Sequence, residues 1–82
     1  MMATELKGQA LLDYYREALR VEYGDEWAEK SVLTYKGAWY YLTIPRRFAN
    51  GIFFDCGPSP YRAAHVREMA DELLRKAKEA DG

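Results

Sequence analysis

The sequence predicts a single small α+β domain, in which two helices cover one face of a three-stranded antiparallel sheet. Three observations support this prediction. Apolar residues recur at spacings of three and four near both ends of the chain, three short strand candidates lie between those segments, and turn dipeptides separate the candidates. The expected order is helix, strand, strand, strand, helix, which is a two-layer α-β-β-β-α domain spanning residues 1–82.

The first helix is expected over residues 9–23. Charged residues take the side opposite its apolar stripe, and Gly24 is suited to end it. The stripe consists of Leu11, Leu12, Tyr15, Ala18, Leu19 and Tyr23. After this helix, Asp25 can cap a short helical turn over residues 25–30, whose largest apolar residue is Trp27.

The strands are expected at about 31–35, 38–44 and 51–56. Lys36 and Gly37 can form a two-residue hairpin turn between the first two strands, because glycine readily adopts positive φ. Pro45 ends the second strand, since proline cannot donate to a sheet ladder. A longer loop then leads to the third strand through Asn50 and Gly51, a strong turn dipeptide.

The last helix is expected over residues 60–80. Ser59 can cap its first turn, and Pro60 suits the next position because proline lacks the amide hydrogen that would go unsatisfied there. The apolar stripe consists of Ala63, Val66, Met69, Ala70, Leu73, Ala77 and Ala80. The other side has opposite charges four residues apart, as is typical of a solvated surface, in the pairs Arg67–Asp71, Asp71–Arg75, Glu72–Lys76 and Arg75–Glu79.

The expected hairpin turn pairs Leu33 with Tyr40 and thereby decides which residues share a face. The face expected to lie against the helices holds Leu33, Tyr35, Tyr40, Leu42, Ile44, Ile52, Phe54 and Cys56. The opposite face holds Val32, Thr34, Trp39, Tyr41, Thr43, Phe53 and Asp55. The rings of Trp39, Tyr41 and Phe53 have no further element of the chain to cover them. An exposed apolar patch of roughly a few hundred Å² usually marks an interaction site.

Three alternatives would leave this aromatic face without a partner, the first being a strand register that differs from the one assumed here. Cross-strand aromatic pairs stabilise an open sheet by roughly 0.2–1 kcal/mol each without any ligand. The short segment that carries Trp27 could also cross to this side of the sheet and cover the rings.

Arg46 and Arg47 are adjacent in the expected loop between the second and third strands, at one end of the aromatic face. Arginines beside exposed rings are typical of single-stranded nucleic-acid surfaces, where bases stack on the rings and cations hold the phosphates. They are equally typical of protein interfaces, where Trp, Tyr and Arg are the commonest hot spots. The third interpretation is an ordinary solubilising loop.

Catalysis has little support in the sequence. Cys56 and His65 are the only pair that resembles a nucleophile and its base. Cys56 is expected on the buried side of the sheet and His65 near the boundary of the helix stripe, so we expect no catalysis by this pair. A single cysteine excludes a disulfide framework within the chain, and no repeated Cys/His spacing or nucleotide motif indicates a metal or a cofactor.

The formal net charge of −1 comes from 12 Lys and Arg residues against 13 Asp and Glu residues. This balance argues against a protein that binds duplex nucleic acid through its overall charge. The order of elements resembles that of the double-stranded RNA-binding domain, but the segment PYRAAHVREMADE lacks the lysine cluster with which that family grips phosphates. No apolar run approaches transmembrane length and no signal-peptide pattern is present, so the expected compartment is the cytoplasm.

The expected function is a non-catalytic protein-interaction module, acting as an accessory or inhibitory factor or as a homodimer, that uses the aromatic sheet face. The expected contact residues are Val32, Trp39, Tyr41, Phe53, Arg46 and Arg47. The alternative is single-stranded nucleic-acid binding through the same face. No duplex nucleic acid, membrane, metal or cofactor is expected as a partner.

Overall fold

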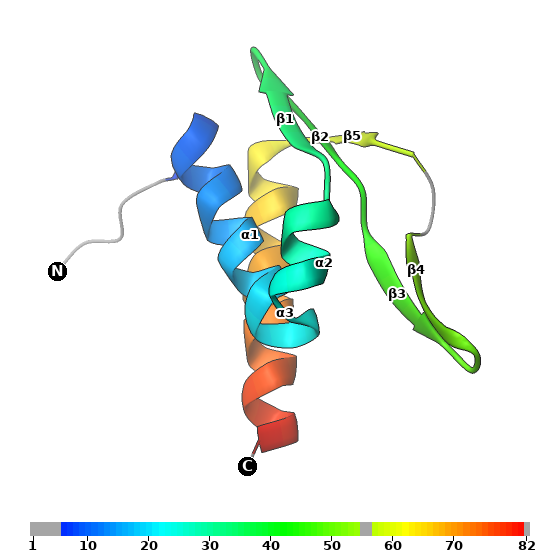
Figure 1. Ribbon diagram of the computed structural model, residues 1–82. Coiled ribbons are helices and arrows are strands. Elements are labelled where there is room, and N and C mark those ends of the chain that lie inside the picture. Colours follow the sequence, from blue (N-terminus) through cyan, green and yellow to red (C-terminus); the bar gives the residue numbers. More distant parts are fainter. Residues whose placement is uncertain (1–5, 55–56, 82) are drawn as a thin grey trace, which may run out of the picture.

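The computed structural model describes residues 6–54 and 57–81, and it has the mixed α+β architecture that the sequence predicts (Figure 1). The elements are, in chain order, α1 (Gly8–Tyr23), α2 (Asp25–Lys30), β1 (Leu33–Lys36), β2 (Trp39–Leu42), β3 (Pro45–Phe48), β4 (Gly51–Phe54), β5 (Ser59–Tyr61) and α3 (Ala63–Asp81). Strands β1, β2 and β5 form an antiparallel sheet in the order β1-β2-β5, which we call the main sheet. Strands β3 and β4 form a separate antiparallel pair, the β3–β4 hairpin.

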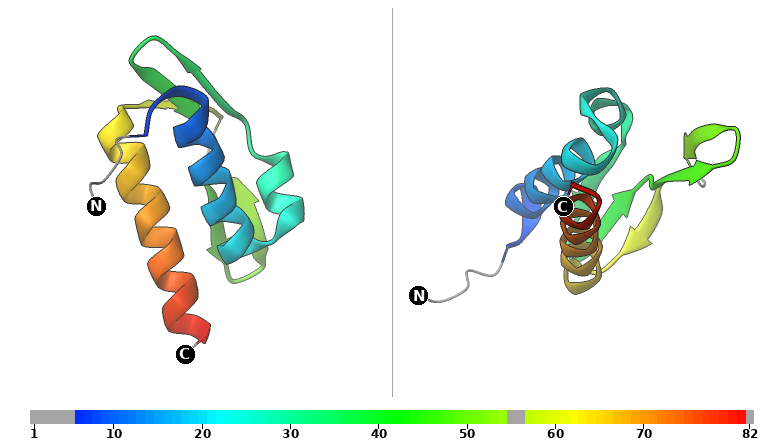
Figure 2. Two further views of the ribbon diagram at one scale, coloured as in Figure 1. Left: turned by 90° about the vertical axis from the view of Figure 1, so that its left-hand side faces the viewer. Right: turned by 90° about the horizontal axis from the view of Figure 1, so that it is seen from below.

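Helices α1 and α3 pack side by side, on one side of the main sheet, and run in the same direction (Figure 1, Figure 2). The buried core consists of Leu11, Leu12, Tyr15, Ala18, Leu19, Ala28, Tyr40, Leu42, Val66 and Ala70. All of these except Ala28 come from the two helix stripes and the inward sheet face that the sequence predicts. The two amphipathic helices and the inward face of the first hairpin are therefore confirmed.

The β1–β2 hairpin turns one residue later than predicted. Its two turn residues are Gly37 and Ala38. Leu33 therefore pairs with Leu42 instead of Tyr40. Gly37 has a φ of 61°, which suits the first position of a tight hairpin turn and which glycine adopts without a steric cost. Since the partner of Leu33 moves by an even number of residues, each side chain keeps its predicted face.

The third strand of the main sheet is not the predicted one. The second edge of β2 pairs with β5, where Tyr61 lies opposite Tyr40. The predicted helix cap at Ser59 and Pro60 is therefore wrong, because both residues belong to β5 and α3 begins only at Ala63. Proline fits in β5 because this strand is at an edge of the described sheet, where a missing N–H leaves no ladder bond unmade.

The predicted third strand, residues 51–56, contributes to the β3–β4 hairpin instead. Residues 51–54 form β4, and residues 55 and 56 lie outside the described residues. The loop expected before this strand is itself mostly a strand, β3, which begins at Pro45, a position where proline is tolerated. Pro45 lies opposite Phe54. The chain passes from β2 into β3, and the turns of the two hairpins point in opposite directions (Figure 1).

The segment after α1 forms the short helix α2, and its tryptophan contacts the β3–β4 hairpin. The ring of Trp27 meets that of Phe54 edge-on, with the ring centroids 5.1 Å apart. Neighbouring residues of a strand point to opposite faces, so Trp27 packs on the face of β4 that is opposite to Phe53. Trp27 therefore anchors the hairpin to α2 instead of covering the rings of the predicted aromatic face.

Candidate interaction surface

The face of the main sheet that points away from α1 and α3 combines residues from all three strands, and we call it the outer face (Figure 2). Cross-strand partners share a face and neighbours along a strand alternate, which assigns its members. The outer face consists of Thr34, Lys36, Trp39, Tyr41 and Pro60, together with Arg62 directly after β5. Tyr41 is partly buried and the other members are exposed.

Trp39 is the largest ring on the outer face, and 40% of it is exposed. The guanidinium of Arg62 lies over this ring, 4.2 Å from its centroid, which is a cation–π contact. Lys36 is the direct cross-strand partner of Trp39. Two cations therefore flank the tryptophan, and because none of the six members of the outer face carries a carboxylate, this face is positively charged.

Val32 extends the outer face by one step beyond β1. Its N–H donates to Oγ1 of Thr43 at 3.0 Å, and its carbonyl oxygen accepts from the N–H of Thr43 at 3.2 Å. These two bonds continue the pairing of the hairpin and leave the Val32 side chain exposed. The structure thus brings together three of the predicted contact residues, Val32, Trp39 and Tyr41.

Phe53 is separated from this group, because it belongs to the β3–β4 hairpin. Its ring lies 5.9 Å from that of Phe48, and each of the two side chains is about half exposed. The outer face and this phenylalanine pair belong to different sheets. The sequence prediction of one continuous aromatic face through Trp39, Tyr41 and Phe53 is therefore wrong, since it assumed that β4 pairs with β2.

Arg46 and Arg47 are strand residues of β3, and they have different surroundings. Arg47 donates from Nη1 to Oε2 of Glu22 at 2.7 Å and from Nη2 to the carbonyl oxygen of Glu22 at 2.9 Å. Its guanidinium also lies 4.7 Å from the ring centroid of Tyr23. Arg47 therefore ties the hairpin to the end of α1, whereas Arg46 lines a pocket between the helices and β3. The predicted rim of two loop arginines is therefore corrected: both residues belong to β3, where Arg46 lies directly opposite Phe53 and Arg47 is bonded to α1.

The structure gives no geometry for catalysis by Cys56 and His65. Cys56 lies outside the described residues, and the His65 ring packs edge-on against Tyr61 with the centroids 5.1 Å apart. Within residues 6–54 and 57–81, no group of three or more His, Cys, Asp or Glu residues is arranged to hold a metal ion. No helix in the described part of the chain is both long enough and apolar enough to cross a membrane.

The sequence prediction missed three residues of these surfaces: Lys36, Phe48 and Arg62. The sequence pattern predicts Lys36 in the turn, Phe48 in a loop and Arg62 in the first turn of the last helix. The signal for Arg62 was the alternation in Ser59–Tyr61, which places the residue after β5 on the same face as Pro60.

Comparison with known proteins adds no functional information. No family model matches the sequence, and no curated protein and no solved structure is significantly similar to it. The functional argument therefore rests on the chain itself.

Proposed function

We propose that this chain is a non-catalytic protein-interaction module that holds an acidic segment of another protein against the outer face of its main sheet. The observation that supports this most directly is the exposure of Trp39 on a sheet face that α1 and α3 do not cover. A half-exposed tryptophan beside Tyr41 and Val32 has the composition of an interface hot spot, in which aromatic anchors are surrounded by polar residues.

The charge of the outer face favours an acidic partner over a second copy of this chain. In a symmetric dimer the same patch meets itself, so the cations of one outer face would lie close to the cations of the other. Like charges across an interface oppose association. An acidic segment would instead pair with both cations while its apolar side chains contact Trp39.

A protein partner is also favoured over single-stranded nucleic acid. A nucleic-acid strand needs a row of cations along its backbone path. The outer face supplies Lys36 and Arg62, whereas Arg47 is bonded to Glu22 and Arg46 lines a different surface. The whole chain carries a formal net charge of −1, which adds no general attraction for phosphates.

The test is selection of peptides from a random displayed library on the purified protein, followed by affinity measurements with the enriched peptides. We expect enriched sequences that combine Asp or Glu with apolar residues. Trp39→Ala should weaken their binding by about 30-fold, as at a hot spot, and Arg62→Gln by about fivefold. Phe53→Ala is the matched control, because it removes an equally exposed ring from the other sheet and should leave affinity unchanged.

Four results would contradict this proposal. Enriched peptides without acidic residues, or full binding by a folded Trp39→Ala variant, would mean that the outer face is not the contact surface. A dimer in solution-mass measurements that becomes a folded monomer on Trp39→Ala would assign this face to self-association. Binding of oligothymidine that needs Trp39 and weakens steeply with salt would assign it to single-stranded nucleic acid.

A further inference from the structure

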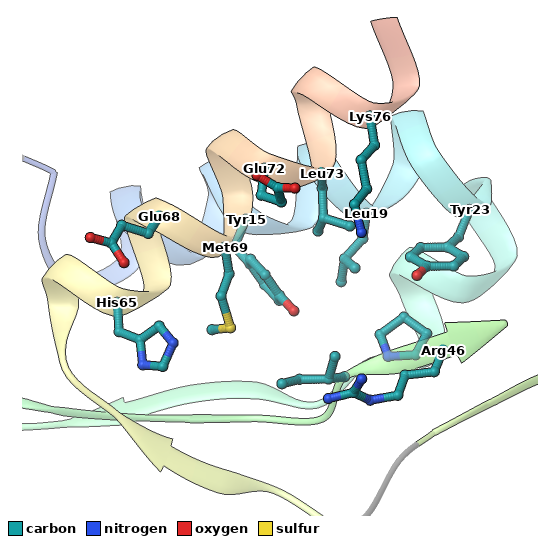
Figure 3. Close-up of a pocket in the computed structure, with 12 residues that line it drawn as sticks. Tyr15, Leu19, Tyr23, Arg46, His65, Glu68, Met69, Glu72, Leu73 and Lys76 are labelled. Atoms are coloured by element: carbon teal, nitrogen blue, oxygen red, sulfur yellow. The ribbon is translucent and has the colours of Figure 1, made fainter. Parts of the chain in front are cut away.

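A pocket of about 400 Å³ opens on the helix side of the molecule, between α1, α3 and the passage from β2 to β3 (Figure 3). Its volume lies within the range of roughly 300–1,000 Å³ that is usual for small-molecule sites. Tyr15 and Tyr23 reach it from α1, Met69, Leu73 and Lys76 from α3, and Arg46 from β3. The pocket and the outer face have no residue in common.

The pocket exists because the main sheet covers only part of α3. Val66 and Ala70 are fully buried where β2 lies against the helix. Strand β2 ends at Leu42, and the β3–β4 hairpin continues in another direction (Figure 1). Met69 and Leu73 of the same apolar stripe are consequently only partly buried and form an apolar wall of the pocket.

The hydroxyl of Tyr15 is the unusual feature of this pocket. The residue is 1% exposed, and its hydroxyl forms no hydrogen bond with any residue that the structure describes. Figure 3 shows this hydroxyl pointing into the pocket, toward the side occupied by Arg46. Burial raises the pKa of Tyr15, so the group stays protonated at neutral pH and is available as an O–H donor. Among the described residues no fully buried side-chain polar atom lacks a partner, so the Tyr15 hydroxyl is open to the pocket, where water or a bound molecule can accept its hydrogen bond.

The groups around this hydroxyl are also donors. The Tyr23 side chain and the ammonium of Lys76 lie at the same end of the pocket (Figure 3). Glu72 also lines the pocket, but its carboxylate is paired with Arg75. Glu68 lies toward the opposite end, near His65 (Figure 3). One end is therefore rich in hydrogen-bond donors and positive charge, next to an apolar wall.

We infer that this pocket binds a small carboxylate with an apolar body. The carboxylate would accept from the hydroxyl of Tyr15 and pair with Lys76, and the apolar body would lie on Met69 and Leu73. A carboxylate accepts hydrogen bonds from several donors at once, and a hydrogen bond to a charged acceptor is stronger than one between neutral groups.

The test uses two probes of the same shape, phenylbutyrate and its neutral amide phenylbutyramide, in NMR titrations of the ¹⁵N-labelled protein. We expect phenylbutyrate to shift the resonances of Tyr15, Met69 and Leu73 and to bind more tightly than the amide. Tyr15→Phe keeps the ring and removes only the hydroxyl, so it should weaken phenylbutyrate binding by about tenfold. Lys76→Gln should weaken it by about two- to fivefold, because this ammonium is partly screened by solvent.

Matched controls lie on the same two helices. Tyr14→Phe and Lys78→Gln change residues that do not line the pocket, and each should alter phenylbutyrate affinity by less than about twofold. If phenylbutyrate fails to bind, if the amide binds equally well, or if neither Tyr15→Phe nor Lys76→Gln weakens binding, the inference is wrong. Should Tyr15→Phe fail to fold, Lys76→Gln on the helix surface still decides the question. All these results are independent of peptide binding at the outer face.

Discussion

At the scale of single residues, the backbone conformation of Gly8 favours glycine, and an added Cβ would make a tight contact with the end of the half-exposed Tyr35 side chain. The φ of Gly8 is 62° and lies in the left-handed region, which costs other residues about 1–2 kcal/mol. A Cβ atom here would lie 3.3 Å from the Tyr35 hydroxyl oxygen. The N–H of Gly8 also donates to the Tyr40 hydroxyl at 2.7 Å, which joins the start of α1 to β2.

Gly8→Ala should therefore lower the free energy of unfolding by about 1–3 kcal/mol, as measured by urea denaturation. Gly57→Ala is the matched control, since an added Cβ at Gly57 meets no atom within 4 Å and its φ is not in the left-handed range. If both variants are equally stable, the backbone at Gly8 is not restrained in the way described.

The sequence shows Gly8 only as an interruption near the start of a helical pattern. Its partner, Tyr40, is 32 residues away, so no local signal reports the contact. The burial of Tyr40 itself was predictable, because alternation along a strand depends on neighbouring residues alone. The burial of a residue can thus be predicted from its sequence neighbours, whereas a contact with a residue far away in the sequence cannot.

At the scale of elements, the β3–β4 hairpin depends on side-chain anchors. A two-stranded hairpin is at best marginally stable by itself in water. Arg47 bonds to Glu22 at the end of α1, and Phe54 packs on Trp27 of α2. These contacts involve both strands of the hairpin, so together they hold it against the helices.

Arg47→Gln should remove the bonds to Glu22 and increase the equilibrium constant for local opening of β3 and β4 by about fivefold. This factor corresponds to about 1 kcal/mol, a typical contribution of a charged pair in which one side chain is half exposed. Amide hydrogen exchange measures this directly, and amides of β1 and β2 should keep their protection. Arg75→Gln is the control, because its ion pairs with Glu72 and Glu79 lie within α3 alone. Uniform loss of protection in both sheets would mean that the hairpin does not open as a separate unit.

The sequence prediction misassigned those segments that can pair with more than one strand or adopt more than one secondary structure. Residues 51–54 have the alternation of a strand, and that pattern does not say whether β2 or β3 pairs with them. Residues 45–48 were predicted as a loop because they begin with proline and contain two arginines, yet proline at the first position of a strand is tolerated. Ser59 and Pro60 fit a helix cap by local preference, but the vacant edge of β2 outweighs that preference.

At the scale of the whole molecule, the two proposed sites are on opposite sides of the main sheet. They exist because the helices cover only one face of this sheet and the sheet covers only part of α3. The helices cover the inward face of β1, β2 and β5, which leaves Trp39 on the outer face. The same sheet is too short to cover the second half of α3, which leaves the pocket beside Tyr15. The sequence predicted the first consequence from alternation, whereas the second depends on how far β2 extends along α3.

The whole molecule should also lose stability at alkaline pH, because the fold raises the pKa of several tyrosines. A hydrogen bond to Asp71 raises the pKa of Tyr14, and burial raises those of Tyr15 and Tyr23. The folded state therefore keeps these phenol protons at a pH where the unfolded chain, with an ordinary pKa of about 10, has lost them. These three tyrosines therefore contribute their full stabilisation below about pH 10, and this stabilisation is lost as the pH rises through their folded-state pKa values.

Urea denaturation from about pH 8 to about pH 11 should give a constant free energy of unfolding at first and a decline above about pH 10. Each such tyrosine adds up to about 1.4 kcal/mol per pH unit to the decline. Tyr15→Phe should make the decline shallower while changing stability little at neutral pH, since the hydroxyl that it removes has no hydrogen-bond partner among the described residues. If the slope is unchanged in this variant, Tyr15 ionises as easily in the folded protein as in the unfolded chain. Its hydroxyl would then not be the buried donor that we expect to bind a carboxylate in the pocket.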